Sequence, residues 1–96
     1  DRYGAVRNDR GLDVQALYRY ANDGRHGERT VKGFPGAEDI DLDDLLTTPC
    51  TVLVPAALER VITAENAGRL KCRVLAEGAN GPTTPDADAV LERSDI

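Results

Sequence analysis

The sequence has 96 residues, enough for one modest domain. Its formal net charge is −5 and it has no run of basic residues, which argues against nucleic-acid binding, because phosphate recognition needs a basic patch. No apolar stretch approaches the roughly 18 residues that a membrane-spanning helix needs, so we expect no membrane partner.

Two helices are predicted in the first half of the chain. Asp13 is a good N-cap residue for the first. The apolar residues of this segment fall on one helical face: Leu12, Ala16, Leu17, Tyr20 and Ala21. The helix is predicted to end at Asn22-Asp23-Gly24, with Gly24 as the C′ residue. Asp41 predicts the cap of a short second helix, Leu42 to Leu46, which ends before Pro49.

The segments beside these helices predict loops rather than sites. Arg25 to Lys32 is polar, and we interpret its His26 as a solvated loop histidine, not a catalyst or ligand. The turn that holds Phe34 is expected to pack onto the edge of the core. The acidic run Glu38 to Asp44 predicts a solvated helix start, because negative charges are favoured there. It lacks the glycine-punctuated spacing of a calcium loop, so we predict no metal site.

The second half of the chain predicts a strand, a helix and another strand. Thr51–Val54 and Cys72–Ala76 are short apolar runs without alternation, typical of parallel strands buried on both faces. Ile62 to Leu70 has helical spacing, with Thr63 as its cap. The fold class predicted from this order is α/β, with a parallel sheet and flanking helices. Thr84-Pro85 predicts the start of a last helix, whose buried stripe is Ala87, Val90 and Leu91.

Ligands of parallel α/β sheets bind beyond the carboxyl ends of the strands. Here those ends are Pro55-Ala56-Ala57 and the glycine-flanked segment around Asn80. The Asn80 amide offers a donor and an acceptor to a ligand, although asparagine also serves simply as a turn residue. Glu59 and Glu77 are either general bases or ordinary surface carboxylates. No phosphate loop, serine–histidine pair or metal quartet is present, so we predict no catalytic residue in this chain.

Two cysteines each open a predicted strand, Cys50 and Cys72. Two free, core-facing thiols in a cytoplasmic protein are expected. A disulfide or redox pair is the alternative, although the spacing is not that of a CxxC motif.

Five segments together resemble the nucleotide-binding domain of glutamate dehydrogenase, in the glutamate, leucine, phenylalanine and valine dehydrogenase family. They are Gly11–Asp13, Lys32–Glu38, Val54–Glu59, Ile62–Ala67 and Ala76–Asp88. The resemblance covers essentially the whole chain. The run EGANGPTTP within the last segment is long and specific, and it favours glutamate dehydrogenase over the leucine and phenylalanine enzymes.

The resemblance implies an enzyme that uses NAD or NADP to interconvert glutamate with 2-oxoglutarate and ammonium. It implies a homohexamer whose active site lies between a substrate domain and a Rossmann-type cofactor domain. Residues 1–96 would be part of the cofactor domain, without its phosphate-binding loop. The family's catalytic lysine and aspartate lie in the substrate domain, which also binds most of the glutamate. We therefore expect a chain cut from a longer protein and inactive by itself.

The resemblance also implies roles for four residues. Asp1 matches the position that faces the adenine ribose, where a carboxylate generally favours NAD, although NADP enzymes of this family also carry an acid there. Ala56 and Ala57 match small residues that let the cofactor approach the backbone. Asn80 matches the asparagine that holds the nicotinamide ribose. Val61 departs from the family, because many members have a glutamine there that can reach the cofactor.

Two alternatives to a glutamate dehydrogenase remain open. One is a stand-alone, non-catalytic binding or interaction module derived from this family, and the other is a different amino-acid dehydrogenase. A sheet of few strands exposes its edges and one face, so we also expect the isolated chain to be marginally stable or to self-associate.

Overall fold

The computed structural model describes residues 1–23 and 28–96. The chain forms two compact units, Asp1–Leu45 and Leu46–Ile96. The predicted C′ residue Gly24 and the loop histidine His26 lie outside the described residues. Within the described ranges, no helix is both long and apolar enough to cross a membrane.

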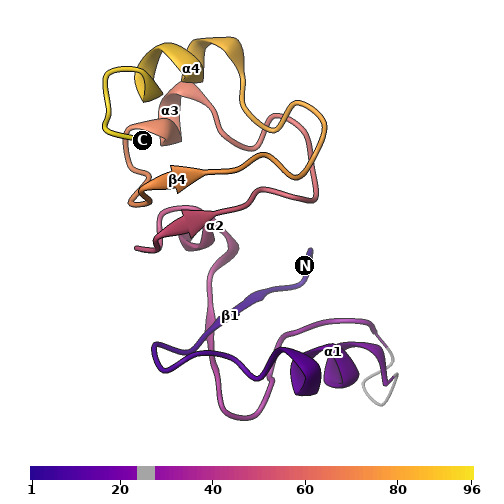
Figure 1. The fold of residues 1–96 in the computed structure, drawn as a ribbon. Coiled ribbons are helices and arrows are strands. Elements are labelled where there is room, and N and C mark those ends of the chain that lie inside the picture. Colours follow the sequence, from indigo (N-terminus) through magenta and orange to yellow (C-terminus); the bar gives the residue numbers. More distant parts are fainter. Residues whose placement is uncertain (24–27) are drawn as a thin grey trace. The chain divides into compact units, whose positions relative to one another are not determined.

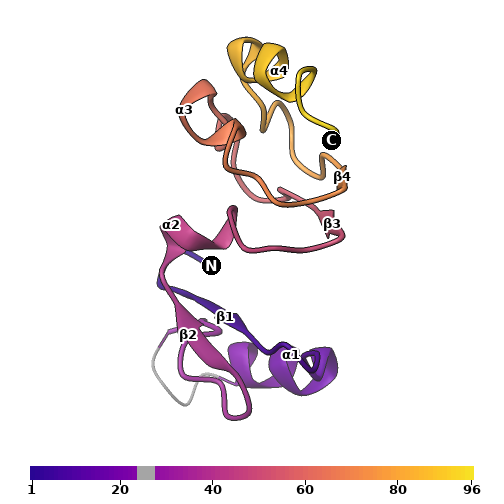
Figure 2. The same ribbon diagram turned by 90° about the vertical axis from the view of Figure 1, so that its left-hand side faces the viewer.

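The first unit contains an antiparallel strand pair, β1 (Ala5–Arg7) and β2 (Glu38–Ile40), shown in Figure 2. Arg7 lies opposite Glu38, and its Nε lies 3.3 Å from the Glu38 carboxylate. This antiparallel pair was not part of the predicted parallel sheet, and Glu38 lies in a strand, so the predicted helix start does not extend to the beginning of the acidic run. Opposite charges directly across a strand pair stabilise it, and this long-range pairing keeps residues 38–40 extended. The same carboxylate and that of Asp9 raise the pKa of Arg7, with Asp9 the stronger influence.

Helix α1 (Val14–Asn22) begins as predicted, because the Asp13 carboxylate accepts a hydrogen bond of 3.0 Å from the backbone N–H of Ala16. The predicted apolar face is half-buried, whereas Val14 and Tyr18 on the other side are each 70% exposed. Phe34 packs within the same unit, with its ring centroid 5.5 Å from that of Tyr20. The short helix α2 (Leu42–Leu45) confirms the prediction to within one residue.

The second unit has the predicted order of strand, helix and strand: β3 (Val52–Leu53), α3 (Ala64–Ala67) and β4 (Val74–Leu75). The strands are parallel, with Val52 opposite Val74, as predicted. Both strands and the helix are shorter than expected. The prediction that both faces of these strands are buried is wrong for the described residues, because Val52 is 50% exposed and Val74 is 51% exposed. Helices α3 and α4 (Pro85–Leu91) lie side by side on the other face (Figure 1).

The core of the second unit is centred on Ile62, Ala67 and Ala87, which are at most 1% exposed. Leu53 and Leu75 contribute the inner face of the strand pair. The last helix matches its prediction, with Thr84 at the N-cap, Pro85 in the first turn, and the stripe Ala87, Val90 and Leu91 against the core. Cys72 is buried, whereas Cys50 is exposed, so only one of the two thiols faces the core. Neither belongs to a disulfide.

The Asn66 side chain connects the residues on either side of Ile62. Its Oδ1 accepts a hydrogen bond of 2.9 Å from the backbone N–H of Thr63, and its Nδ2 donates one of 2.8 Å to the carbonyl of Val61. Both bonds are partly buried. They hold the backbone of Ile62 in place beneath α3 and α4.

Replacing Asn66 with alanine should therefore lower the free energy of unfolding by about 1–2 kcal/mol, because two partly buried backbone groups lose their partners. Urea denaturation of the full-length protein measures this change. Asn22→Ala is the matched control, since the Asn22 amide donates only to the exposed carbonyl of Tyr18 in its own helix. We expect a change within about 0.5 kcal/mol for that control. Equal effects of the two substitutions would contradict the role given to Asn66.

Candidate functional site

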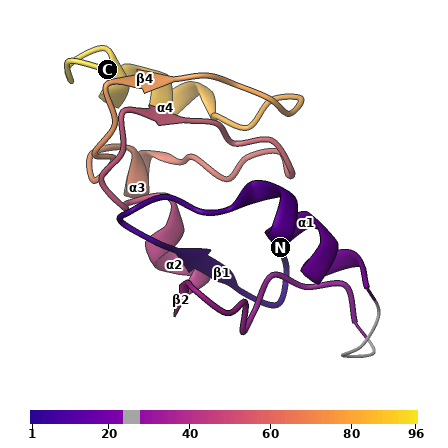
Figure 3. The ribbon, with the colours of Figure 1, turned by 60° about the horizontal axis from the view of Figure 1, so that its bottom comes forward.

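The two parallel segments of the second unit remain hydrogen-bonded beyond the ends of β3 and β4. Ala76 N–H donates to Leu53 O at 2.9 Å, and Gly78 N–H donates to Pro55 O at 3.0 Å. The pairing resumes where Arg60 N–H donates to Gly81 O at 2.9 Å, and it continues with Ile62 N–H to Pro82 O at 2.9 Å. Between these bonds, residues 56–59 and 79–80 leave the ladder; we call them the site loops. Figure 3 shows both segments leaving the strands in the same direction.

Gly78 lies where the two segments come closest. An ideal Cβ built on Gly78 would be 2.9 Å from the Cβ of Ala56 and 3.2 Å from Cγ1 of Val54. Methyl groups cannot approach so closely, and neither neighbouring group is the far end of a flexible side chain. Position 78 therefore requires a residue without a side chain. The sequence placed this glycine beside Asn80 but did not predict the close contact, which depends on residues more than twenty positions apart.

The site loops present small groups and one amide. Ala56, Ala57 and Asn80 are all exposed. Among the residues that the structure describes, the side chain of Asn80 makes no hydrogen bond, so its donor and acceptor are both available. The hydrogen bonds between the segments bring Ala56 and Asn80 to the same end of the strand pair, as the sequence predicted. A flat or extended ligand with polar groups could lie across this surface.

Arg60 ends the first site loop in an unusual conformation. Its φ is +57°, in the left-handed region, and its backbone N–H donates to Gly81 O at 2.9 Å. Gly81 has a φ of +56°, which a glycine adopts without strain. For arginine the same conformation costs about 1–2 kcal/mol, because its Cβ crowds the following carbonyl. The hydrogen bond to Gly81 holds Arg60 there and closes the site loops.

Replacing Arg60 with glycine should therefore raise the free energy of unfolding by up to about 1 kcal/mol. The relief of strain exceeds the extra freedom that glycine has in the unfolded chain. Glu59→Gly is the matched control. Glu59 precedes Arg60 and does not share its positive φ, so only the unfavourable entropy of glycine should appear. A thermal unfolding series would contradict the argument if both substitutions were equally destabilising.

Two carboxylates, Glu59 and Glu77, lie near the site loops. Both are exposed, and neither side chain makes a hydrogen bond within the described ranges. The Thr84 hydroxyl donates to Asp86 and holds the pKa of that carboxyl below its usual value. This bond belongs to the start of α4 and not to the site loops.

Thr83 has a buried hydroxyl directly after the second site loop. Its Oγ1 has no hydrogen-bond partner among the described residues. An unpaired buried hydroxyl is unfavourable, so a polar group from outside these residues would be stabilised there. Pro82 beside it is fully buried.

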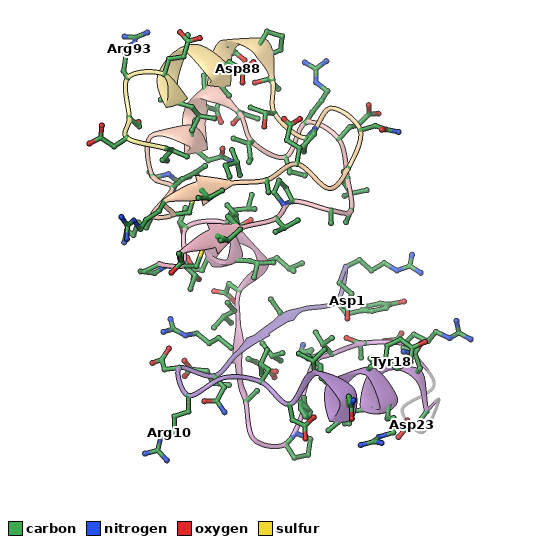
Figure 4. The ribbon with its side chains drawn as sticks, in the orientation of Figure 1. Asp1, Arg10, Tyr18, Asp23, Asp88 and Arg93 are labelled. Carbon is green, nitrogen blue, oxygen red and sulfur yellow. The ribbon has the colours of Figure 1, made fainter. Side chains whose placement is uncertain are left out.

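Asp1 belongs to the first unit, and its carboxylate organises the chain around it (Figure 4). Its Oδ2 accepts a hydrogen bond of 2.7 Å from the backbone N–H of Val31. Its Oδ1 accepts bonds from Tyr3 N–H at 2.8 Å, Gly4 N–H at 3.3 Å and the Thr30 hydroxyl at 3.1 Å. The carboxylate therefore ties residues 30–31 to the start of β1. Each carboxylate oxygen has about two lone-pair sites, and Oδ2 accepts only one of these bonds, so one position on Oδ2 stays open.

Cavities and metal ligands do not define this site. Two surface cavities in the first unit, of 460 and 440 Å³, are lined by none of the four predicted site residues. No group of three or more His, Cys, Asp or Glu side chains in the described residues could hold a metal ion.

Comparisons with known proteins agree on one family. The sequence model of the Glutamate/Leucine/Phenylalanine/Valine dehydrogenase family matches residues 1–96. A glutamate dehydrogenase of Thermotoga maritima is 47% identical over 96 residues, which is 100% of this chain and 22% of the relative. A crystal structure of Plasmodium falciparum glutamate dehydrogenase shares the fold, with a TM-score of 0.74 and 22% identity over 97% of this chain and 21% of that one. The chain thus spans about a fifth of the length of these relatives.

Proposed function

Because this chain belongs to the Glutamate/Leucine/Phenylalanine/Valine dehydrogenase family, we propose that it is part of an NAD(P)-dependent glutamate dehydrogenase. The full-length enzyme would convert glutamate into 2-oxoglutarate and ammonium. The 47% identity to the Thermotoga enzyme supports this substrate over the other amino acids of the family. The observation that carries the proposal is the pair of site loops. There the close contact between Gly78 and Ala56, which only glycine allows, lies next to the exposed, unpaired amide of Asn80.

The site loops would bind the nicotinamide and its ribose. Ala56 and Ala57 expose nothing larger than a methyl group, so a planar ring can approach the backbone closely. The free amide of Asn80 can donate to one ribose hydroxyl and accept from another. When bound, the dinucleotide supplies the hydride acceptor, and the residues of this chain bind and orient it.

Asp1 would contribute to the adenosine end of the cofactor. Four internal hydrogen bonds hold its carboxylate rigidly, and the open lone pair of Oδ2 can accept from a ribose hydroxyl. A pre-ordered acceptor loses little entropy when the ligand binds. A carboxylate at this place is compatible with NAD and, within this family, with NADP.

The rest of the enzyme would come from chain outside residues 1–96. The exposed face of the strand pair, formed by Val52, Val54 and Val74, supports this part of the proposal. Parallel sheets are normally covered on both faces, so these valines are expected to be covered in a larger Rossmann-type sheet. The catalytic lysine and aspartate, the phosphate-binding loop and most contacts with glutamate would also lie outside. A cytoplasmic homohexamer is the proposed assembly.

The test is the substitution Asn80→Ala in the full-length enzyme. Loss of the amide should raise the cofactor KM or lower kcat by more than about tenfold, a loss of roughly 1.4 kcal/mol or more. Steady-state kinetics with NAD and with NADP measure the effect. The ratio of kcat/KM for the two cofactors also decides the preference between them.

Asn22→Ala, on the exposed surface of α1, is the matched control for this experiment and should leave the kinetics unchanged. Unchanged kinetics for Asn80→Ala as well would contradict the assignment of Asn80. A full-length protein that binds a dinucleotide but turns over no amino acid would favour the non-catalytic module instead. Turnover of leucine or phenylalanine in preference to glutamate would favour another dehydrogenase of the family.

A further inference from the structure

Cys50 and Cys72 lie just upstream of the two parallel strands, in segments that a backbone hydrogen bond joins. Val52 and Val74 are Cα partners, and each cysteine is two residues upstream of one of them. The backbone N–H of Cys50 donates to Lys71 O at 3.1 Å. In a parallel ladder this bond forms when the donor residue faces the residue after the acceptor, which here is Cys72.

This placement is compatible with a disulfide. Neighbouring strands are about 4.7–4.9 Å apart, and the Cα atoms of disulfide-bonded cysteines are usually about 4.4–6.8 Å apart. Both thiols are free in the structure. Burial raises the pKa of Cys72, and the neighbouring Cys50 raises it further.

The two thiols differ in access to solvent. Cys50 is exposed, whereas Cys72 is only 8% exposed and belongs to the core cluster of the second unit. An oxidant in solution can thus reach Cys50 first. Cys72 is positioned to react afterwards, from inside the protein, with whatever has formed on Cys50.

We propose that Cys50 and Cys72 form an oxidisable dithiol, a modification site that takes a small-molecule disulfide as its oxidant and closes to a disulfide between β3 and β4. In the first step the Cys50 thiolate attacks one sulfur of the oxidant, so that a mixed disulfide forms and one thiolate leaves. In the second step Cys72 loses its proton and attacks Sγ of Cys50. The new bond forms, the second small thiolate leaves, and two electrons have passed from the protein to the oxidant.

The modification is separate from the proposed cofactor site. The cysteines lie at the amino ends of β3 and β4, whereas the site loops follow the carboxyl ends. The cross-link would join the two segments just upstream of β3 and β4. Its formation can therefore be measured without cofactor or activity, and its failure would leave the proposed function untouched.

The experiment treats the native full-length protein with oxidised glutathione, blocks the remaining thiols and maps the peptides by mass spectrometry. Trypsin cleaves after Lys32, Arg60, Lys71 and Arg73, so it separates the two cysteines into peptides 33–60 and 72–73. We expect these two peptides to be joined by a disulfide that dithiothreitol reverses. Below the raised pKa of Cys72, the rate of closure should increase about tenfold per pH unit.

Two variants separate the steps. Cys72→Ser should stop at the first step and accumulate a stable glutathione adduct on Cys50. Cys50→Ser should react at least about tenfold more slowly than the native protein, because only the buried thiol remains. A stable adduct on Cys50 of the native protein, with Cys72 still free, would overturn the proposal. Absence of any reaction at Cys50 would overturn it equally.

Discussion

Replacement of Ile62 by alanine is expected to lower the free energy of unfolding by about 2–5 kcal/mol, the largest effect of any single substitution proposed for this protein. Ile62 is 0% exposed and lies among Ala67, Leu70 and Ala87 in the core of the second unit. Alanine would remove three buried carbon atoms and leave a cavity that α3 and α4 cannot fill without moving. The lost burial and the cavity both contribute to the destabilisation.

Ile62 also connects the core to the site loops. Its N–H donates to Pro82 O at 2.9 Å, and its carbonyl accepts from Thr84 N–H at 2.9 Å. A core that collapses around residue 62 would therefore disturb the second site loop, and cofactor affinity should fall together with stability. Denaturant titration and cofactor binding of the full-length variant measure the two effects.

Two further substitutions make the Ile62 prediction specific. Ile62→Val removes one methylene and should cost only about 0.5–1.5 kcal/mol. Val14→Ala, at a position that is 70% exposed, should change stability by no more than about 0.5 kcal/mol. If Ile62→Ala lowered the free energy of unfolding as little as Val14→Ala, Ile62 would not be the centre of the core.

The second large effect is expected for Gly78→Ala, which should lower stability by about 1–3 kcal/mol through overpacking. The new methyl group would lie 2.9 Å from the Cβ of Ala56, so the two segments must separate. Because the cofactor is proposed to bind across these segments, kcat/KM for the cofactor should fall by about tenfold or more. Thermal unfolding and steady-state kinetics test the two consequences.

Gly68→Ala is the control, since it adds the same methyl group at a position where there is space for it. Gly68 has a φ of −70°, and a Cβ built there would meet only Val90 Cγ1, at 3.8 Å. Alanine at such a position restricts the unfolded chain and should stabilise the protein by about 0.4–1 kcal/mol. The two glycine substitutions are thus expected to have opposite signs. The same sign for both would contradict the close contact at Gly78.

Ala56→Gly should partly rescue Gly78→Ala, because it removes the atom with the closest contact. The two remaining contacts, with Val54 Cγ1 at 3.2 Å and with the Cα atom of residue 56 at 3.3 Å, are less severe. A double-mutant cycle should therefore give a coupling energy of about 0.5–3 kcal/mol between positions 56 and 78. Strict additivity would show that the two residues do not touch.

Local signals in the sequence predicted the helix starts well. Asp13 and Thr84-Pro85 act within their own first turn, so their effect depends little on the rest of the chain. The apolar face of α1 was predicted for the same reason, since helical periodicity decides which residues share a side. The order of strand, helix and strand in the second half was also correct.

Predictions that depended on distant partners were less successful. Glu38 was assigned to a helix start because it opens an acidic run, but pairing with Arg7, thirty-one positions earlier, makes it extended. The valines of β3 and β4 were expected to be covered on both faces, and about half of the surface of Val52 and Val74 is open in this chain. An apolar run indicates that a strand can be buried, whereas the actual burial depends on what packs against it.

The sequence by itself determined the family, the helix caps and the ends of the two parallel strands, because these features lie in short continuous motifs. Only the tertiary structure decided that Gly78 must be a glycine, that Arg60 has a positive φ, and that the Cys50 N–H bonds to Lys71, the residue before Cys72. Each of these depends on parallel pairing between segments about twenty residues apart. In a parallel strand pair, the register decides which residues of the two segments become neighbours. That register is set when the helix between the strands packs against the core.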